Sequence, residues 1–188
     1  DILMLPYGIG QKVEFQKGFG PILGDLNLDS INKINESVFI KKLEPIYKAI
    51  ETVSKDKIIT NKDLICFVGA PWTLLVYMLN KQSPKKELNK KLLEDKVFVD
   101  ELLLIIDKFL KIHIHNQIKR GATIIQIFDS WAGIIKKKDI PKYIYEPTAR
   151  IVKFIKSKKI PVICFPRNIK NYKKFCEVVN PSAVNIDY

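Results

Sequence analysis

Tyr77 and Ser130 are the polar side chains whose positions in this sequence best fit a ligand site. Residues 67–74 read Phe-Val-Gly-Ala-Pro-Trp-Thr-Leu, which predicts the end of an apolar strand, a tight turn and a helix that begins with proline. Tyr77 then falls on the second turn of that helix, where its phenol can donate a hydrogen bond to a carboxylate. Residues 126–133 read Gln-Ile-Phe-Asp-Ser-Trp-Ala-Gly, so Ser130 follows a second strand. Because α/β proteins bind ligands at the carboxyl ends of strands, both residues are candidates.

Each candidate also has a purely structural interpretation. Tyr77 fits a core tyrosine whose hydroxyl reaches the surface, and spacing alone favours that interpretation over a substrate contact. Ser130 and the preceding Asp129 fit a turn or a helix cap, positions that both residue types favour.

Nucleophilic serine chemistry and a histidine metal site are both disfavoured. Ser130 lacks the Gly-x-Ser-x-Gly pattern of a nucleophile elbow. The two histidines, His113 and His115, are two residues apart on a predicted helix and therefore face different directions.

The composition fits one globular domain with a basic surface. The 188 residues are 47% hydrophobic and 28% charged, and the formal net charge is +12. Nucleic-acid binding is disfavoured, because specific sites recruit arginine forks and only Arg120, Arg150 and Arg167 are arginines. The lysines are scattered, as at Lys85, Lys86, Lys90 and Lys91, and the run 136–138 fits a solvated loop. The same field would steer a polycarboxylate substrate.

The cysteines and the longest apolar segment favour a cytoplasmic protein that binds no membrane. Cys66, Cys164 and Cys176 match no metal or redox spacing, and the first two lie in apolar runs typical of buried thiols. An odd count with no signal peptide in the sequence indicates a reducing compartment. Charged residues interrupt the segment 97–118, so it reads as a core helix.

Short apolar runs alternate with helical patterns along the chain. Strands rich in Ile, Val, Phe and Cys, as expected for strands buried on both faces, are predicted at 64–68, 123–128, 162–165 and 183–186. Helices are predicted at 43–53, 97–120, 147–156 and 172–179. This rhythm predicts βα units with a parallel sheet, either an open doubly wound sheet or a closed (β/α)8 barrel. Residues 12–15 and 19–23 predict a β-hairpin beside it.

Taken together, the motifs resemble uroporphyrinogen decarboxylases of the heme pathway. Gly-Ala-Pro-Trp-Thr at 69–73 with Tyr77-Met78, and Phe-Asp-Ser-Trp-Ala-Gly at 128–133, fall in that family's order and approximate spacing. Further similarities are Asp1-Ile2-Leu3, Gly-Phe-Gly-Pro at 18–21 and Ile186-Asp187-Tyr188. The resemblance covers essentially the whole chain.

The resemblance implies a (β/α)8 barrel that works as a homodimer without metal or cofactor. It implies decarboxylation of the four acetate side chains of uroporphyrinogen III, giving coproporphyrinogen III. In that family's pattern, Asp1 matches the aspartate that accepts the pyrrole N–H hydrogen bonds, Tyr77 the tyrosine that contacts a substrate carboxylate, and Ser130 the serine that binds a propionate or acetate arm.

We expect residues 1–188 to be a single domain, the internal part of such a barrel from the end of its second strand to its sixth. The family's amino-terminal arginine segment and its carboxyl-terminal Gly-His-Gly segment are not in this sequence. An arc of a barrel has two open edges and an exposed interior. We therefore predict that the chain by itself is inactive and poorly folded.

Two other function classes compete with this interpretation. A zinc-dependent methyltransferase of the same superfamily, acting on corrinoid or thiol substrates, needs thiolate and imidazole ligands at strand ends. The strand ends here offer Asp129-Ser130 and Pro166-Arg167-Asn168, with no His-x-Cys. A non-enzymatic basic binding module is the third class and the least favoured.

Overall fold

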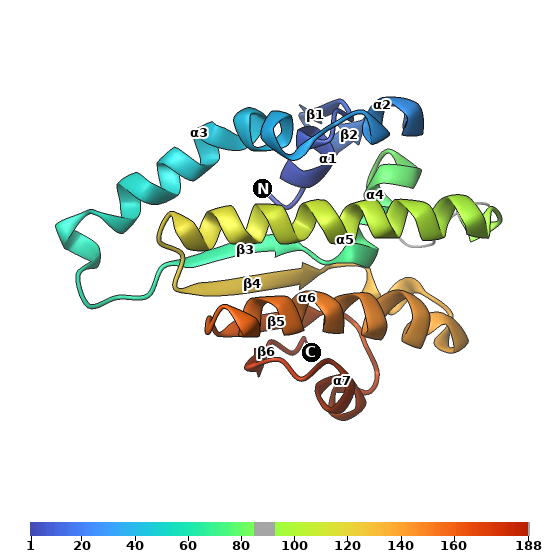
Figure 1. Ribbon diagram of the computed structural model, residues 1–188. Coiled ribbons are helices and arrows are strands. Elements are labelled where there is room, and N and C mark those ends of the chain that lie inside the picture. Colours follow the sequence, from blue (N-terminus) through green and yellow to red (C-terminus); the bar gives the residue numbers. More distant parts are fainter. Residues whose placement is uncertain (85–92, 188) are drawn as a thin grey trace.

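The chain alternates strands and helices in the order that its sequence predicts (Figure 1). The structure, a computed structural model, describes residues 1–84 and 93–187. Its first elements are α1 (Met4–Gly8), β1 (Val13–Gln16), β2 (Gly20–Leu23), α2 (Leu28–Asn32), α3 (Glu36–Ser54) and η1 (Lys57–Ile59). The others are β3 (Ile65–Gly69), α4 (Pro71–Asn80), α5 (Lys96–Lys119), β4 (Ile124–Asp129), η3 (Ala132–Ile134), η4 (Lys137–Asp139), η5 (Pro141–Tyr145), α6 (Glu146–Ser157), β5 (Val162–Pro166), α7 (Tyr172–Val179) and β6 (Ala183–Val184). Lys85, Lys86, Lys90, Lys91 and Tyr188 lie outside the described residues.

A four-stranded parallel sheet in the order β3-β4-β5-β6 forms the centre of the fold. Val68 pairs with Ile127, Ile127 with Cys164, and Cys164 with Val184, so the strands run in chain order with a helix between each pair. The predicted βα units are confirmed. The predicted hairpin is confirmed as well, because β1 and β2 pair antiparallel around a turn in which Gly18 adopts a φ of 82°.

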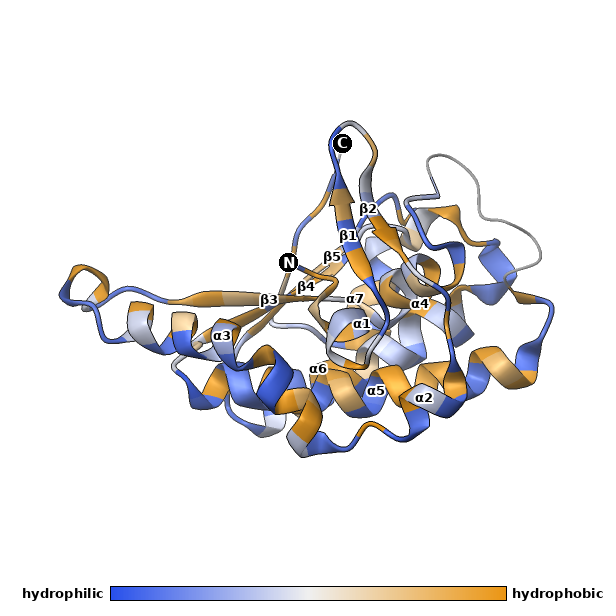
Figure 2. Ribbon diagram, turned by 90° about the horizontal axis from the view of Figure 1, so that it is seen from above, coloured by the Kyte–Doolittle hydropathy of each residue, from blue (hydrophilic) through white to orange (hydrophobic). Residues whose placement is uncertain are grey.

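One face of this sheet is covered by helices, and the other face is open. Helices α3, α5 and α6 lie on the same side of β3 and β4 (Figure 2). Side chains of Cys66, Val68 and Ile127 are buried beneath them, whereas Ile65 and Phe67 are 47% and 42% exposed. The expectation of strands buried on both faces is therefore wrong here. The physical reason is that the described residues supply four strands, an arc whose concave side has no opposing strands.

The long helices follow their local sequence signals. The side chain of Asp95 accepts a hydrogen bond from the Phe98 N–H and caps α5, which ends before Gly121 at a φ of 113°. Helix α3 begins earlier than the predicted residue 43, because the Asn35 side chain caps it by accepting from the Val38 N–H. None of the helices in the two described ranges is long and apolar enough to cross a membrane.

Two local features differ from the sequence-based expectation, and a third agrees with it. Residues 1–3 form a turn before α1 instead of the end of a strand, so the described residues contribute four parallel strands rather than about five. The solvated turn predicted at 136–138 is confirmed, because these residues are exposed and 137 and 138 lie in the 3-10 turn η4. Helix α6 continues directly from the π-helical η5, and Pro147 is tolerated in its first turn because no N–H donor is needed at that position.

Candidate active site

Asp1 lies beside the carboxyl end of β3. A side chain added at Gly69 would come within 3.4 Å of the Ile2 Cβ, which shows how closely the first residues pack on that strand end. Asp1 itself is exposed, and its Oδ1 accepts a hydrogen bond of 2.7 Å from the Leu3 N–H. This bond orients the carboxylate.

Tyr77 and Ser130 lie at the same edge of the sheet, on neighbouring βα units. Tyr77 is on the second turn of α4 and only 9% exposed, and its ring meets the Trp131 ring edge-on at 6.1 Å between centroids. Ser130 directly follows β4 and is half-buried. The structure thus places Tyr77 close to the segment that carries Ser130. The three predicted residues share one edge, although Asp1, Tyr77 and Ser130 form no hydrogen bond with one another among the described residues.

The two sequence motifs are hydrogen-bonded directly to each other. The Thr73 hydroxyl donates to Asp129 Oδ1 at 2.7 Å and accepts from the Trp131 N–H at 3.2 Å. The Trp72 indole N–H donates to the Trp131 carbonyl at 2.8 Å, and the Ala70 N–H donates to the Phe128 carbonyl at 2.8 Å. The turn before α4 and the segment after β4 are therefore held together by a continuous set of hydrogen bonds.

Asp129 is a buried carboxyl group, whereas its residue type and position predicted a turn or cap residue. It is 3% exposed, and burial raises its pKa to about 7 against the opposing influence of the Thr73 hydroxyl and backbone N–H. Its Oδ2 has no hydrogen-bond partner within the described residues. The alternation of Ile125, Ile127 and Asp129 along β4 was the available signal, since it places all three on the helix-covered face.

Three phenylalanines form a row across the open face of the sheet. The ring of Phe128 on β4 meets Phe67 on β3 and Phe165 on β5 edge-on, at centroid distances of 5.7 and 6.3 Å. The row lies near the carboxyl ends of the strands, where Asp1, Tyr77 and Ser130 are located. An apolar surface next to polar side chains suits a large ring-shaped ligand with polar substituents.

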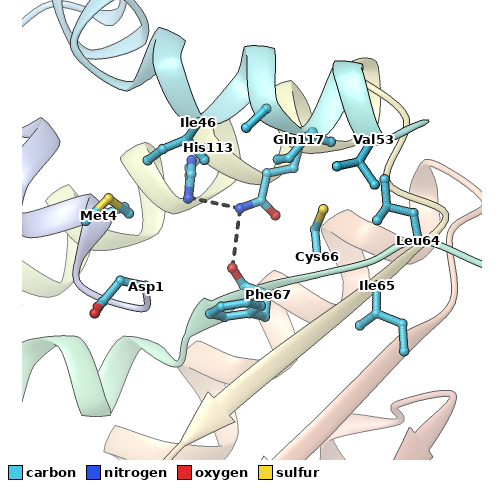
Figure 3. Close-up of a pocket in the computed structure, with 12 residues that line it drawn as sticks. Asp1, Met4, Ile46, Val53, Leu64, Ile65, Cys66, Phe67, His113 and Gln117 are labelled. Carbon is cyan, nitrogen blue, oxygen red and sulfur yellow. Dashed lines mark hydrogen bonds between the residues drawn. The ribbon is translucent and has the colours of Figure 1, made fainter. Parts of the chain in front are cut away.

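A cavity of about 260 Å³ lies between α3, α5 and β3, next to Asp1 (Figure 3). Within it, the Gln117 amide reaches between His113 Nε2 at 3.0 Å and the Phe67 carbonyl at 3.3 Å. The other ring nitrogen of His113 is 3.0 Å from the Tyr47 hydroxyl, and burial lowers the pKa of His113 to about 4. His113 is therefore a neutral core residue. His115 is exposed, which confirms that the two histidines face different directions.

A second cavity of about 630 Å³ lies between the segment after β4 and the segment that leads into α7. Lys137, Lys170 and Lys174 contribute to its lining, and it contains none of the three predicted site residues. The two segments approach very closely where Gly133 meets Asn168, since a Cβ on Gly133 would lie 2.4 Å from the Asn168 Cβ. Positive charge is thus available near the same edge of the sheet.

The comparisons with known proteins agree with this arrangement. The family model described as uroporphyrinogen decarboxylase (URO-D) matches residues 1–188. The chain belongs to the uroporphyrinogen decarboxylase family. This confirms the resemblance and identifies the sheet with its helices as part of a (β/α)8 barrel.

Relatives with the same name support the assignment to the uroporphyrinogen decarboxylase family. The chain is 38% identical to the uroporphyrinogen decarboxylase of Rickettsia bellii, over all of the chain and 56% of that protein. It is 35% identical to that of Campylobacter jejuni, over 92% of the chain and 52% of that protein. The chain spans about half the length of the curated relatives it matches. A solved methyltransferase from Methanosarcina mazei shares the fold, with a TM-score of 0.69 at 14% identity over 99% of the chain and 62% of that protein.

The described part of the barrel has no set of zinc ligands of the kind that the methyltransferase alternative requires. Within residues 1–84 and 93–187 no three His, Cys, Asp or Glu side chains are grouped to hold a metal ion. Cys66 and Cys164 are buried, as predicted. Burial raises the pKa of Cys66 to about 11 and that of Cys164 well above its usual range, so both thiols stay protonated and are poor metal ligands.

Proposed function

We propose that the whole protein carrying this chain is a carboxy-lyase that converts uroporphyrinogen III to coproporphyrinogen III by removing carbon dioxide from its four acetate side chains. The observation that carries the proposal is the direct bonding of the two family motifs, Thr73 to Asp129 and Trp131, at the carboxyl edge of the sheet. This contact places Tyr77 and the segment of Ser130 side by side in a chain whose family membership is established.

Asp1 is proposed to stabilise the charge that develops during decarboxylation. Loss of carbon dioxide leaves an electron pair, and a protonated pyrrole ring of the substrate supplies the electron sink without a cofactor. A carboxylate set against the pyrrole N–H groups favours that cationic ring, and the effect grows where water is excluded. The Leu3 N–H bond to Asp1 Oδ1 supports this role, because it fixes the carboxylate before substrate arrives.

Tyr77 and Ser130 are proposed to hold carboxylate arms of the substrate. Both carry a hydroxyl donor, and a hydrogen bond to an ionised carboxylate is roughly twice as strong as one between neutral groups. The aromatic row on the open face suits the macrocycle, and the net charge of +12 attracts a polycarboxylate. We expect the whole protein to act as a homodimer in the cytoplasm, without metal or cofactor.

The test is anaerobic incubation of the whole protein with uroporphyrinogen III, followed by oxidation and separation of the porphyrins by carboxylate number. Species with seven, six, five and four carboxylates should appear in sequence. Asp1→Asn should lower kcat on the order of 10²-fold, the usual cost of removing an electrostatic stabiliser. Tyr77→Phe and Ser130→Ala should raise KM about tenfold, the loss of one charge-assisted hydrogen bond.

Asp29→Asn and Tyr7→Phe are matched controls, because they make the same chemical changes at exposed residues of α2 and α1. Full activity of Asp1→Asn would remove the proposed role of Asp1. No conversion by a folded wild-type protein that contains bound zinc would replace the decarboxylase with the methyltransferase alternative.

A further inference from the structure

The contact between Thr73 and Asp129 is a buried polar contact, and neither side chain has a role of its own in the proposed chemistry. Thr73 is fully buried and Asp129 is 3% exposed. A buried carboxyl group costs free energy unless it is hydrogen-bonded, and here one oxygen is bonded while Oδ2 has no partner in the described residues. Packing alone would favour an apolar residue at this position of β4.

Asp129 accepts a hydrogen bond from the first turn of helix α4, which has no side-chain N-cap. The N-cap residue is Ala70, which has no side-chain acceptor, and Pro71 follows it at the first turn. The first backbone N–H groups of a helix need an acceptor, and a carboxylate there also interacts favourably with the helix dipole. The Thr73 hydroxyl in this first turn donates to Asp129, so a carboxyl group at the end of β4 lies against the helix N-terminus.

The Thr73 hydroxyl is hydrogen-bonded to the residues on both sides of Ser130. Asp129 accepts from the Thr73 hydroxyl, and the Trp131 N–H donates to that same hydroxyl oxygen. Ser130 is the residue between these two anchored positions. Thr73 therefore contributes, with the Trp72 indole N–H, to placing the Ser130 backbone relative to α4.

Thr73 also lies on the helix face that carries Tyr77. Residues four apart on a helix are neighbours on one face, so the hydroxyl that anchors the Ser130 segment is one turn from the Tyr77 ring. Trp131 links the Ser130 segment to α4 a second time, because its ring packs on Tyr77 and its carbonyl accepts from the Trp72 indole. The distance between the Tyr77 and Ser130 side chains thus depends on this network.

We propose that Thr73 and Asp129 are positioning residues that fix Ser130 relative to Tyr77 and so set the spacing at which two carboxylate arms of one ligand are held. This inference rests on the proposed function for the identity of the ligand. Beyond the proposed function, it states that the spacing of Tyr77 and Ser130 is set by a contact between two neighbouring βα units. Neither residue contacts substrate.

The test compares Thr73→Val, which keeps the shape and removes the hydroxyl, with Thr73→Ser, which keeps the hydroxyl. Binding of oxidised uroporphyrin III to the whole protein is measured by tryptophan fluorescence quenching, and KM and kcat for uroporphyrinogen III are measured in parallel. We expect Thr73→Val to weaken binding and raise KM about tenfold, with kcat changed less than about threefold. Thr73→Ser should restore both constants to within about threefold.

Thr148→Val is the matched control, because Thr148 is equally buried on α6 but its hydroxyl has no partner among the described residues. It should leave binding and KM unchanged. If Thr73→Val does not fold, Thr73→Cys carries the test with a smaller expected loss of about threefold, because a thiol is a weak donor and acceptor.

A double-mutant cycle separates positioning from a general loss of structure. If Thr73 acts through Ser130, then Ser130→Ala weakens binding in the wild type but has little further effect in Thr73→Val. Additive losses, or wild-type binding by Thr73→Val, overturn the inference. A wild-type protein that binds uroporphyrin III but converts no uroporphyrinogen III contradicts the proposed function alone, whereas a wild type that does not bind it contradicts both.

Discussion

Substitution of Asp129 by asparagine should change how the stability of the whole protein depends on pH. Burial raises the pKa of Asp129 from 3.8 to about 7 in the folded protein. A carboxyl group with a raised folded-state pKa binds more protons in the folded than in the unfolded chain between these two values. Its favourable contribution is therefore complete below pH 3.8 and is lost as the pH rises through 7.

The size of the effect follows from that difference in pKa. Each pKa unit corresponds to about 1.4 kcal/mol, so ionisation of Asp129 destabilises the fold by about 4 kcal/mol at pH 8, of which about 3 kcal/mol develops between pH 5 and pH 8. Asparagine keeps the acceptor for Thr73 but places an amide where Oδ2 has no partner, which costs about 1–3 kcal/mol. The variant should be close to or below the wild type at pH 5 and more stable at pH 8.

Urea unfolding of wild type, Asp129→Asn and Asp29→Asn at pH 5 and pH 8 measures this effect. The free energy of unfolding of the wild type minus that of Asp129→Asn should fall by about 3 kcal/mol from pH 5 to pH 8. Other groups that titrate, such as His113, are present in both proteins and cancel in the difference. The neighbouring Cys164 thiol stays neutral because burial raises its pKa. Parallel pH profiles for wild type and Asp129→Asn would refute the reasoning, and Asp29→Asn should run parallel because Asp29 is exposed.

Three further predictions concern other parts of the chain. Gly133→Ala should destabilise the whole protein by about 1–3 kcal/mol in urea unfolding, because the new Cβ would lie 2.6 Å from the Asn168 carbonyl oxygen; an unchanged midpoint would contradict this. The folded-state pKa of His113 is lowered to about 4, so its contribution is present above pH 6.5 and is lost as the pH falls; thermal unfolding of His113→Gln should therefore show a shallower decline from pH 7 to pH 4 than the wild type. The 188-residue chain by itself should convert no uroporphyrinogen III and show no sharp thermal transition, since Phe67 is 42% exposed on an uncovered sheet face; a cooperative transition would count against it.

The types and order of the elements could be read from the sequence because the signals are local. Helix α7 occupies the predicted residues 172–179. Helix α5 ends at Lys119, one residue before the end predicted from the stop signal of Gly121. Apolar runs of four to six residues predicted each of the four strands, and alternation with helices predicted that they are parallel. The two motifs at 69–73 and 128–133 also placed Tyr77 and Ser130 at strand ends.

The tertiary structure decided which faces are buried and which motif residues touch. Periodicity could not show that Ile65 and Phe67 face an open side of the sheet, because burial depends on how many strands and helices surround a strand. Nor could it show that Asp129 accepts from Thr73 on the first turn of α4, since hydrogen bonds between residues far apart in the chain leave no local pattern. The raised pKa of Asp129 and the lowered pKa of His113 arise from desolvation, which exists only once the chain has packed around each side chain.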